Sequence, residues 1–254
     1  MPQGSMRSDL YPELYQVEDN HWWHQQKRRV IHQLIRRYRP QTGKASLAES
    51  RRVLDVGCGA GKILWELSQN GWQAEGVDFH ISQGEKRKLK LVKADLEHRP
   101  LPSPANRFDL TICLDTLEHI ADDQRLVKEM ARVTKPGGFI IISVPAYPWL
   151  FSYWDKMLGH FRRYTKKNLL QATVKSGLKL KFASYFFSFL LLPAIFVRLV
   201  KIIIRQKQQS DFAANPLPVL THGLVGFFGH LELLWLKRFK IPLGLSLVCV
   251  LEKK

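Results

Sequence analysis

The spacing of hydrophobic residues along the chain changes from a helical period to short apolar runs and back. Between residues 30 and 38, apolar side chains recur every three or four positions, which is typical of one face of a helix. Residues 53–56 then form a short apolar run, as expected of a strand buried in a parallel sheet. A glycine-rich turn, a helix over about residues 62–69 and a second strand in "QAEGVDF" complete a strand–helix–strand unit.

The alternation of strands and helices continues through the middle of the chain. The stretches "KLVKADL", "FDLTICLD" and "FIIISVPA" are predicted strands, "DDQRLVKEMARVT" is a predicted helix, and "KPGG" is a predicted turn. Further on, "LLQATVKSGLKLKFASYF" predicts a helix followed by a strand, "LVGFFGHLELLWLKRF" a helix and "GLSLVCVLEKK" a closing strand. Such alternation indicates a parallel sheet that helices cover on both faces.

The segment that follows residue 181 is unusually apolar. Residues 182–197 carry no charged side chain, and Arg198, Lys201 and Arg205 then follow at helical spacing. Because this run is shorter than the ~20 residues of a spanning helix and contains Pro193, we do not expect it to cross a membrane. Two interpretations stay open: a helix packed on the sheet, or a helix in a membrane interface with its cations toward lipid headgroups.

The positive charge of the chain is concentrated near its end. Of the net charge of +17, residues 1–52 carry +5, residues 53–154 carry −1 and residues 155–254 carry +13. A basic surface attracts the phosphates of nucleic acid or of anionic lipid, whereas the simplest alternative is a role in solubility alone.

Cysteine usage and the first residues of the chain bear on its compartment. Cys58, Cys113 and Cys249 are scattered without paired or metal-ligand spacing, which predicts a reducing compartment and no disulfide framework. The opening residues contain no apolar run of the kind found in secretory signals. We therefore expect a cytoplasmic protein, with a peripheral position on the inner membrane surface as the alternative.

The stretch "VLDVGCGAG" carries the strongest chemical signal. Gly57, Gly59 and Gly61 follow a strand and precede a helix, where glycine lets backbone approach a ligand closely. A dinucleotide site needs G-x-G-x-x-G, but the position of its third glycine is Lys62 here. Asp55 would repel a pyrophosphate, whereas it suits a ligand that carries an ammonium group.

Two further acids stand at the ends of the next predicted strands. Asp78 ends the second strand, where a carboxylate accepts hydrogen bonds from ribose hydroxyls. Asp95 ends the third strand, where a carboxylate accepts from an adenine amino group. The alternative is that Asp78 and Asp95 only cap helices. Together with Asp55, the three acids indicate a ligand made of adenosine and an amino acid.

At this point the sequence resembles the class I S-adenosylmethionine-dependent methyltransferases over roughly residues 50–180. The resemblance rests on "VLDVGCGAG", "GVDFH", "KADL", "FDLTICLDTLEHI" and "RVTKPGGFIIISVP" in this order. It implies an α/β fold with a Rossmann-like seven-stranded sheet whose last strand is antiparallel. It implies S-adenosyl-L-methionine as the cofactor, held by the following residues: Asp55, Gly57, Cys58, Gly59, Gly61, Asp78, Phe79, Asp95, Leu96, Leu114 and Asp115.

The acceptor side of the reaction is less defined in the sequence. His119 follows the fourth strand, at the carboxyl edge where ligands bind in such sheets, although a structural hydrogen bond is an alternative role. In "YWDKMLGHFRRYT", Asp155 is placed to orient His160 as a base. The same loop offers groups for binding an anionic acceptor, namely Arg162, Arg163 and Tyr164, unless its arginines only pair with surface acids. Together with "VPAYPWL", this loop resembles a bacterial type 11/12 branch of the methyltransferases.

The stretch "HWWHQQKRR" begins at His21 and precedes the first strand. We expect Trp22 and Trp23 to cover the acceptor pocket as a lid, with Lys27 and the two arginines after it facing solvent or an anionic acceptor. His21 and His24 lack a nearby set of acids or cysteines, so no metal is expected. A membrane interface is the other setting that suits tryptophans beside cations.

These patterns predict one domain with three segments: a helical lid over residues 1–48, a cofactor-binding part over 49–181, and an apolar, basic insertion with a closing strand over 182–254. The expected function is methyl transfer to a small-molecule or lipid-like acceptor, at oxygen rather than carbon or nitrogen. An RNA or protein methyltransferase is the first alternative, although no RNA-binding module is recognisable and nucleic acid is the less expected partner. A non-catalytic cofactor-binding scaffold is the second.

Overall fold

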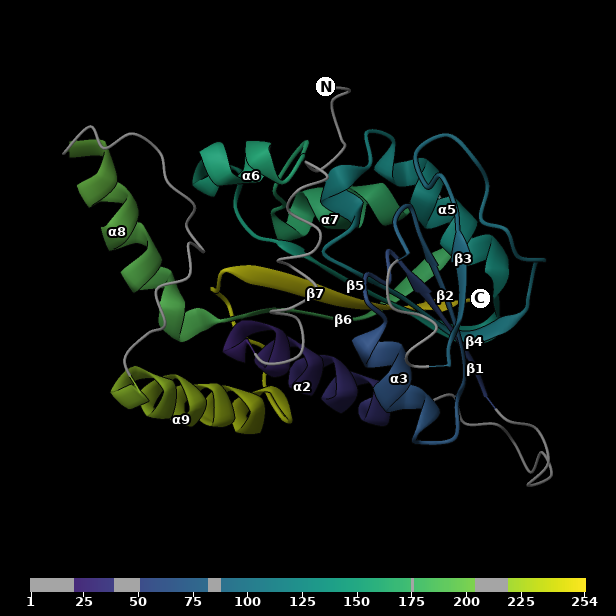
Figure 1. Ribbon diagram of the computed structural model, residues 1–254, viewed down its shortest axis with the longest axis horizontal. Coiled ribbons are helices and arrows are strands. Elements are labelled where there is room, and N and C mark those ends of the chain that lie inside the picture. Colours follow the sequence, from purple (N-terminus) through teal and green to yellow (C-terminus); the bar gives the residue numbers. More distant parts are fainter. Residues whose placement is uncertain (1–20, 39–50, 82–87, 175, 204–218) are drawn as a thin grey trace.

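The computed structural model describes residues 21–38, 51–81, 88–174, 176–203 and 219–254 of the 254-residue chain (Figure 1). Most of the predicted N-terminal segment, which runs to residue 48, lies outside these ranges. Arg205, which the sequence places on one helix face with Arg198 and Lys201, also lies outside them.

Seven strands form one sheet in the order β3-β2-β1-β4-β5-β7-β6 (Figure 1). The strands are β1 Arg52–Val56, β2 Gln73–Asp78, β3 Lys90–Lys93, β4 Phe108–Leu114, β5 Thr134–Pro145, β6 Leu178–Phe186 and β7 Ser246–Lys253. β1 to β5 pair in parallel, while β7 runs antiparallel to both β5 and β6. The predicted α/β fold with an antiparallel last strand is therefore confirmed.

Helices cover both faces of this sheet. They are α2 Trp22–Arg37, α3 Lys62–Ser68, α5 Asp123–Val133, α6 Tyr153–Met157, α7 Lys166–Val174, α8 Leu191–Ile203 and α9 Val219–Leu236, with short 3-10 turns η2 Leu117–His119, η3 Pro148–Leu150 and η4 Ser188–Leu190. Residues of α5 and α7 pack into one core, and residues of α2, α3 and α9 pack into the other on the opposite face (Figure 1). The central strands are apolar on both sides because both sides are buried.

The structure refines two local predictions. The uncharged run 182–197 has two parts: its first residues complete β6, as predicted for the strand in "LKLKFASYF", and after η4 the helix α8 begins only at Leu191. The predicted "KPGG" turn lies inside β5, which begins at Thr134. Gly137 has a φ of +73° there, and the register of the pairing between β4 and β5 shifts nearby. The strand therefore continues through this turn-like stretch as a bulge.

The three segments expected from the sequence are not separate structural units. The boundary at residue 181 falls inside β6, and β7 pairs with β5 on one side and β6 on the other. The apolar, basic segment therefore contributes strands to the same sheet as the glycine turn.

A buried carboxylate connects α9 to the end of β6. Glu232 is almost fully buried on α9 and accepts hydrogen bonds from the backbone N–H groups of Phe187 (2.9 Å) and Ser188 (2.8 Å). It also accepts from the Ser188 hydroxyl at 2.7 Å. A buried carboxylate is costly unless it is hydrogen-bonded, and these three donors satisfy it.

Replacing Glu232 with glutamine tests this connection. The amide keeps the size of the side chain but presents an N–H group where an acceptor is needed, so we expect Glu232→Gln to lower the free energy of unfolding by about 1.5–3 kcal/mol. Urea denaturation measures the change. The matched control is Glu252→Gln, because Glu252 pairs with Lys181 near the surface and its loss should cost less than about 1 kcal/mol. Equal losses of stability in the two variants would contradict a stabilising role of Glu232 between α9 and the end of β6.

Candidate functional site

The glycine turn after β1 is shaped by three residues with left-handed backbone. Gly57, Gly59 and Gly61 have φ values of +80°, +53° and +74°, which glycine adopts without strain. A Cβ on Gly57 would lie 2.0 Å from the hydroxyl oxygen of Thr116, so no larger residue fits there. Gly61 is also the residue directly before α3. The turn therefore brings bare backbone to the carboxyl edge of the sheet, as a cofactor cradle requires.

Asp78, at the end of β2, holds this turn in place. Its carboxylate accepts hydrogen bonds from the N–H groups of Gly59 (2.8 Å) and His80 (2.9 Å). Burial raises the pKa of Asp78, although these N–H donors act in the opposite direction. The same carboxylate lies where the sequence predicts ribose contacts.

The other predicted cofactor residues lie along the same edge, because β3, β2, β1 and β4 are neighbours in this order. Asp55 and Cys58 are buried at the end of β1 and in the turn, and Leu96 is buried after β3, whereas Phe79 is exposed. Asp95 accepts from the N–H groups of the two residues at positions 97 and 98, at 3.0 and 3.1 Å. Asp95 therefore also caps the turn that follows it, which is the alternative role considered in the sequence analysis.

The end of β4 brings a lysine from α2 into the site. Leu114 ends the strand, and Asp115 follows with a φ of +49° and accepts a hydrogen bond from the Ser143 hydroxyl at 3.0 Å. Lys27 forms an ion pair with Asp115 and is buried, so the prediction that it faces solvent is wrong, while the alternative that it faces an anionic acceptor stays a prediction. Burial lowers the pKa of Lys27 to about 8.

A group of ionisable side chains lies next to this ion pair. His160 Nδ1 is 2.9 Å from an oxygen of Asp155, and Arg163 Nε is 2.7 Å from the same oxygen. The hydrogen bond with His160 and the charge of Arg163 hold the pKa of Asp155 well below its usual range, in spite of its burial. The ring of His119 lies edge-on to that of His160, with 4.6 Å between ring centroids. The structure thus brings the three predicted catalytic residues together.

Glu118 belongs to this group, although the sequence analysis did not select it. Its side chain is fully buried, neither carboxylate oxygen has a hydrogen-bond partner among the described residues, and His160 Nε2 is 4.0 Å from Oε1. Burial raises the pKa of Glu118 to about 8, while the charge of Lys27 acts in the opposite direction. An acid directly before His119 in "DTLEHI" was the available signal, but its burial depends on loops that are distant in the sequence.

Glu118, His119 and His160 also form the group that most resembles a metal site within the described ranges. Each offers one ligand atom, and these atoms lie within 4.8 Å of one another. Burial lowers the pKa of His119 to about 3, so its ring is neutral near pH 7. One of these separations, 4.0 Å between His160 Nε2 and Glu118 Oε1, is longer than the roughly 3.4 Å expected between two ligands of a tetrahedral zinc ion, each about 2.1 Å from the metal.

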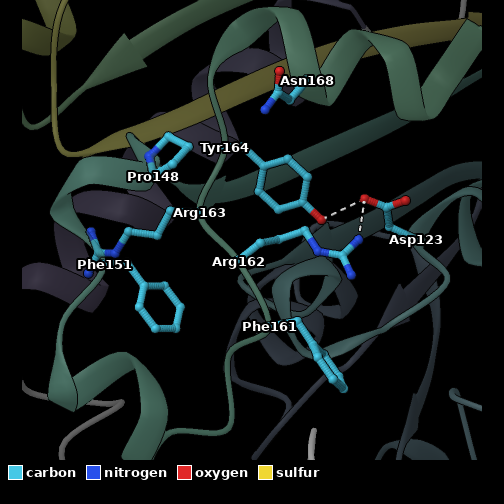
Figure 2. A pocket seen from close by; sticks show the side chains of 8 residues that line it. All are labelled: Asp123, Pro148, Phe151, Phe161, Arg162, Arg163, Tyr164 and Asn168. Carbon is cyan, nitrogen blue, oxygen red and sulfur yellow. Dashed lines mark hydrogen bonds and ion pairs between the residues drawn. The ribbon is translucent and has the colours of Figure 1, made fainter.

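The loop that carries His160 also lines a solvent-open cavity of about 420 Å³ (Figure 2). Arg162 pairs with Asp123 at 3.0 Å and donates to the carbonyl of Ala121 at 2.7 Å. The buried Tyr164 donates its hydroxyl hydrogen to Asp123 at 2.9 Å, as Figure 2 shows. The predicted acceptor-binding residues of this loop therefore also fix its position. The complete lining is Asp123, Pro148, Phe151, Phe161, Arg162, Arg163, Tyr164 and Asn168.

The start of α2 packs against the end of β6. Trp23 stacks on Phe187 with 3.8 Å between ring centroids, and Trp22 approaches the same ring edge-on at 6.3 Å. His21 caps the helix by accepting a hydrogen bond from the Trp23 N–H group. Burial lowers the pKa of His24 to about 3. Both tryptophans are half-buried in this contact, which fixes the helix that carries Lys27.

Comparisons with known proteins agree with this geometry. A family described as a methyltransferase domain matches residues 22–181. A ubiquinone biosynthesis O-methyltransferase of Coxiella burnetii is 34% identical over 102 residues, which are 37% of this chain and 44% of that protein. One of Alkalilimnicola ehrlichii is 34% identical over 103 residues, 37% of this chain and 42% of that protein. The matches therefore span less than half the length of these relatives.

A solved structure shows the same fold over nearly the whole chain. It is a TehB-like SAM-dependent methyltransferase from Corynebacterium glutamicum, with a TM-score of 0.56, 16% sequence identity and coverage of 97% of this chain and 96% of that one. The glycine turn, the acids at the strand ends and the sheet order agree with the family match, which covers more than half of the chain. The chain belongs to the methyltransferase-domain family, among the class I S-adenosylmethionine-dependent methyltransferases, and its cofactor is S-adenosyl-L-methionine.

Proposed function

We propose that this methyltransferase transfers a methyl group to an oxygen atom of a small, lipid-like acceptor. The observation that carries the proposal is the hydrogen-bonded pair of Asp155 and His160, which lies beside Glu118. The similarity to a Coxiella burnetii protein named as a ubiquinone biosynthesis O-methyltransferase supports transfer to oxygen. An apolar surface on α8 and α9 supports a lipid-like acceptor met at a membrane.

The proposed cofactor contacts follow from the strand ends. S-adenosylmethionine carries its methyl group on a positively charged sulfur, so the enzyme mainly aligns the reacting atoms and excludes water. Asp55, Gly57 and Gly59 would hold the methionine end, and Asp78 and Asp95 the ribose and adenine. The remaining contacts would come from Cys58, Gly61, Phe79, Leu96, Leu114 and Asp115.

The proposed proton acceptor is Nε2 of His160. Because the carboxylate of Asp155 can only accept a hydrogen bond, Nδ1 would donate to it, and Nε2 would be the ring nitrogen that takes up the proton. The acceptor hydroxyl would transfer its proton to Nε2 while its oxygen attacks the methyl carbon, and S-adenosylhomocysteine would leave. The imidazolium formed would lie beside the carboxylate of Asp155, which favours its positive charge. His119, neutral and in contact with His160, would restrict the orientation of that ring.

The acceptor would enter between α2 and the loop of His160. Trp22 and Trp23 would cover its apolar part and exclude water. Arg162, Arg163 and Tyr164 would position the loop through the contacts with Asp123 and Asp155. Lys27 would close the pocket beside the methyl-transfer position, because it is buried against Asp115.

An RNA or protein acceptor is the competing proposal, and the basic charge of the chain is what favours it. A labelled-methyl screen of lipid, small-molecule and RNA extracts separates the two. Product in the RNA extract alone, together with salt-sensitive tRNA binding, would overturn a lipid-like acceptor.

Asp55→Asn tests the cofactor site. Because the ammonium group of the cofactor would lose its charged partner, we expect S-adenosylhomocysteine to bind at least tenfold more weakly, as measured by isothermal titration calorimetry. The matched control is Asp109→Asn, since Asp109 lies at the opposite end of β4, where it pairs with Lys135. Unchanged affinity in Asp55→Asn would refute the proposed contact.

His160→Gln tests the proton acceptor. We expect the rate of labelled-methyl transfer to a lipid extract to fall by roughly 10²–10⁴-fold, because an amide does not accept the proton at neutral pH. Affinity for S-adenosylhomocysteine should stay within twofold. The control is His98→Gln, because His98 lies exposed beside Asp95 and away from the proposed base. A variant with normal transfer would exclude His160 as the base.

Removal of metal tests the expectation that the reaction uses none. After dialysis against EDTA, we expect transfer to stay within twofold of the untreated enzyme, because displacement at a methylated sulfonium depends on the alignment of the reacting atoms rather than on a metal ion. Metal analysis of the dialysed protein is the accompanying control. Loss of activity that Zn²⁺ restores would instead assign Glu118, His119 and His160 as ligands.

A further inference from the structure

The outer face of α9 is unusual because the helix is apolar on two opposite sides. Its inner side contacts α2 through Gly229, Leu233 and Leu236, and the buried Glu232 also points inward. On the other side, large apolar side chains recur at helical spacing and are exposed: Leu224, Phe227, Phe228, Leu231, Leu234 and Trp235. A surface helix of a globular protein normally presents polar residues there, so a second apolar face indicates a further partner.

Further large apolar side chains are exposed after α9 and on α8. Phe239 and Leu243 continue it after the helix, at 55% and 56% exposure. On α8, Leu192 and Phe196 are exposed by 75% and 67% and lie one helical turn apart. Phe228 of α9 stacks with Phe189 beside the start of α8, so the two helices adjoin at this corner of the molecule (Figure 1).

The charges around this surface identify the kind of partner. Lys237, Arg238 and Lys240 follow α9 directly and are exposed, next to the exposed ring of Phe239. Within residues 223–243, the only acid is Glu232, and it is buried on the inner side. A surface of leucine, phenylalanine and tryptophan with cations at its margin fits acyl chains below anionic headgroups.

The geometry of α9 also decides between crossing a bilayer and lying on it. Among the described residues, no helix combines the length and the hydropathy needed to cross a membrane. The inner side of α9 is already occupied by α2, with Gln26 Nε2 donating to the carbonyl of Gly229 at 2.6 Å. Only the outer side is available, which is the arrangement of a helix that lies in the plane of the interface.

We infer that α8 and α9 form a docking surface for an anionic lipid bilayer, with the outer face of α9 inserted among the headgroups and Lys237, Arg238 and Lys240 against lipid phosphates. This inference goes beyond the proposed function, which draws on the same surface only for the lipid-like nature of the acceptor. Binding to a bilayer can be measured without any acceptor, so the two can fail separately.

Vesicle flotation with the full chain tests this surface. We expect the protein to float with phosphatidylglycerol-containing vesicles and at least tenfold less with pure phosphatidylcholine. The double variant Phe227→Ala/Trp235→Ala should bind the anionic vesicles at least tenfold more weakly. The triple variant Lys237→Gln/Arg238→Gln/Lys240→Gln should lose most of the preference for anionic lipid. In the wild type, this preference should weaken as the salt concentration rises.

The matched control is Trp65→Ala, because Trp65 is exposed on α3 at a distance from α8 and α9 (Figure 1). It should float like the wild type, and affinity for S-adenosylhomocysteine should be equal in all variants. Equal flotation of the wild type and the double variant would overturn the inference. A second copy of the chain would be the occupant instead if sedimentation shows a dimer that the double variant dissociates.

Discussion

The contact between Gly57 and Thr116 is the constraint on which the site depends. It brings the turn after β1 against the turn after β4, at a distance that excludes even one methyl group on residue 57. The same turn is also fixed by Asp78, which accepts a hydrogen bond from the Gly59 N–H group. With these strand ends held together, the cofactor edge of the sheet and the residues after β4 form one surface. The position of Glu118 and His119 follows from the same contact, since they lie just after Thr116.

The fold and the cofactor edge were predictable because their signals are local. Strand runs, the glycine spacing and the acids at strand ends are read from short stretches, and parallel strands place their carboxyl ends together. The uncharged run after residue 181 was harder to read, since composition alone does not separate the end of β6 from the beginning of α8. Here the pairing of β6 with β7, more than sixty residues away, decides the boundary.

The charged residues of the site were less predictable for a related reason. Lys27 stands among cations in the sequence, and only the packing of α2 beside β4 buries it against Asp115. Glu118 is likewise ordinary in sequence, and its burial depends on the loop that carries His160. Both side chains therefore acquire their shifted pKa values from contacts between distant segments, which periodicity does not record. By contrast, Asp155 and His160 are five positions apart, so their pairing was within reach of the sequence.

Helix α2 contacts α9 on one side and the residue after β4 on another. Gln26, Gln33 and Arg37 donate to carbonyl groups of α9 and the residue that follows it, while Lys27 reaches the end of β4. One rigid element thus contacts both the surface of α9 and the cofactor edge. If binding at one of these places shifts α2, thermodynamic linkage requires that the affinity for the two ligands changes by the same factor in both directions. The contacts of α2 with α9 would then make this helix the physical connection between membrane binding and cofactor binding.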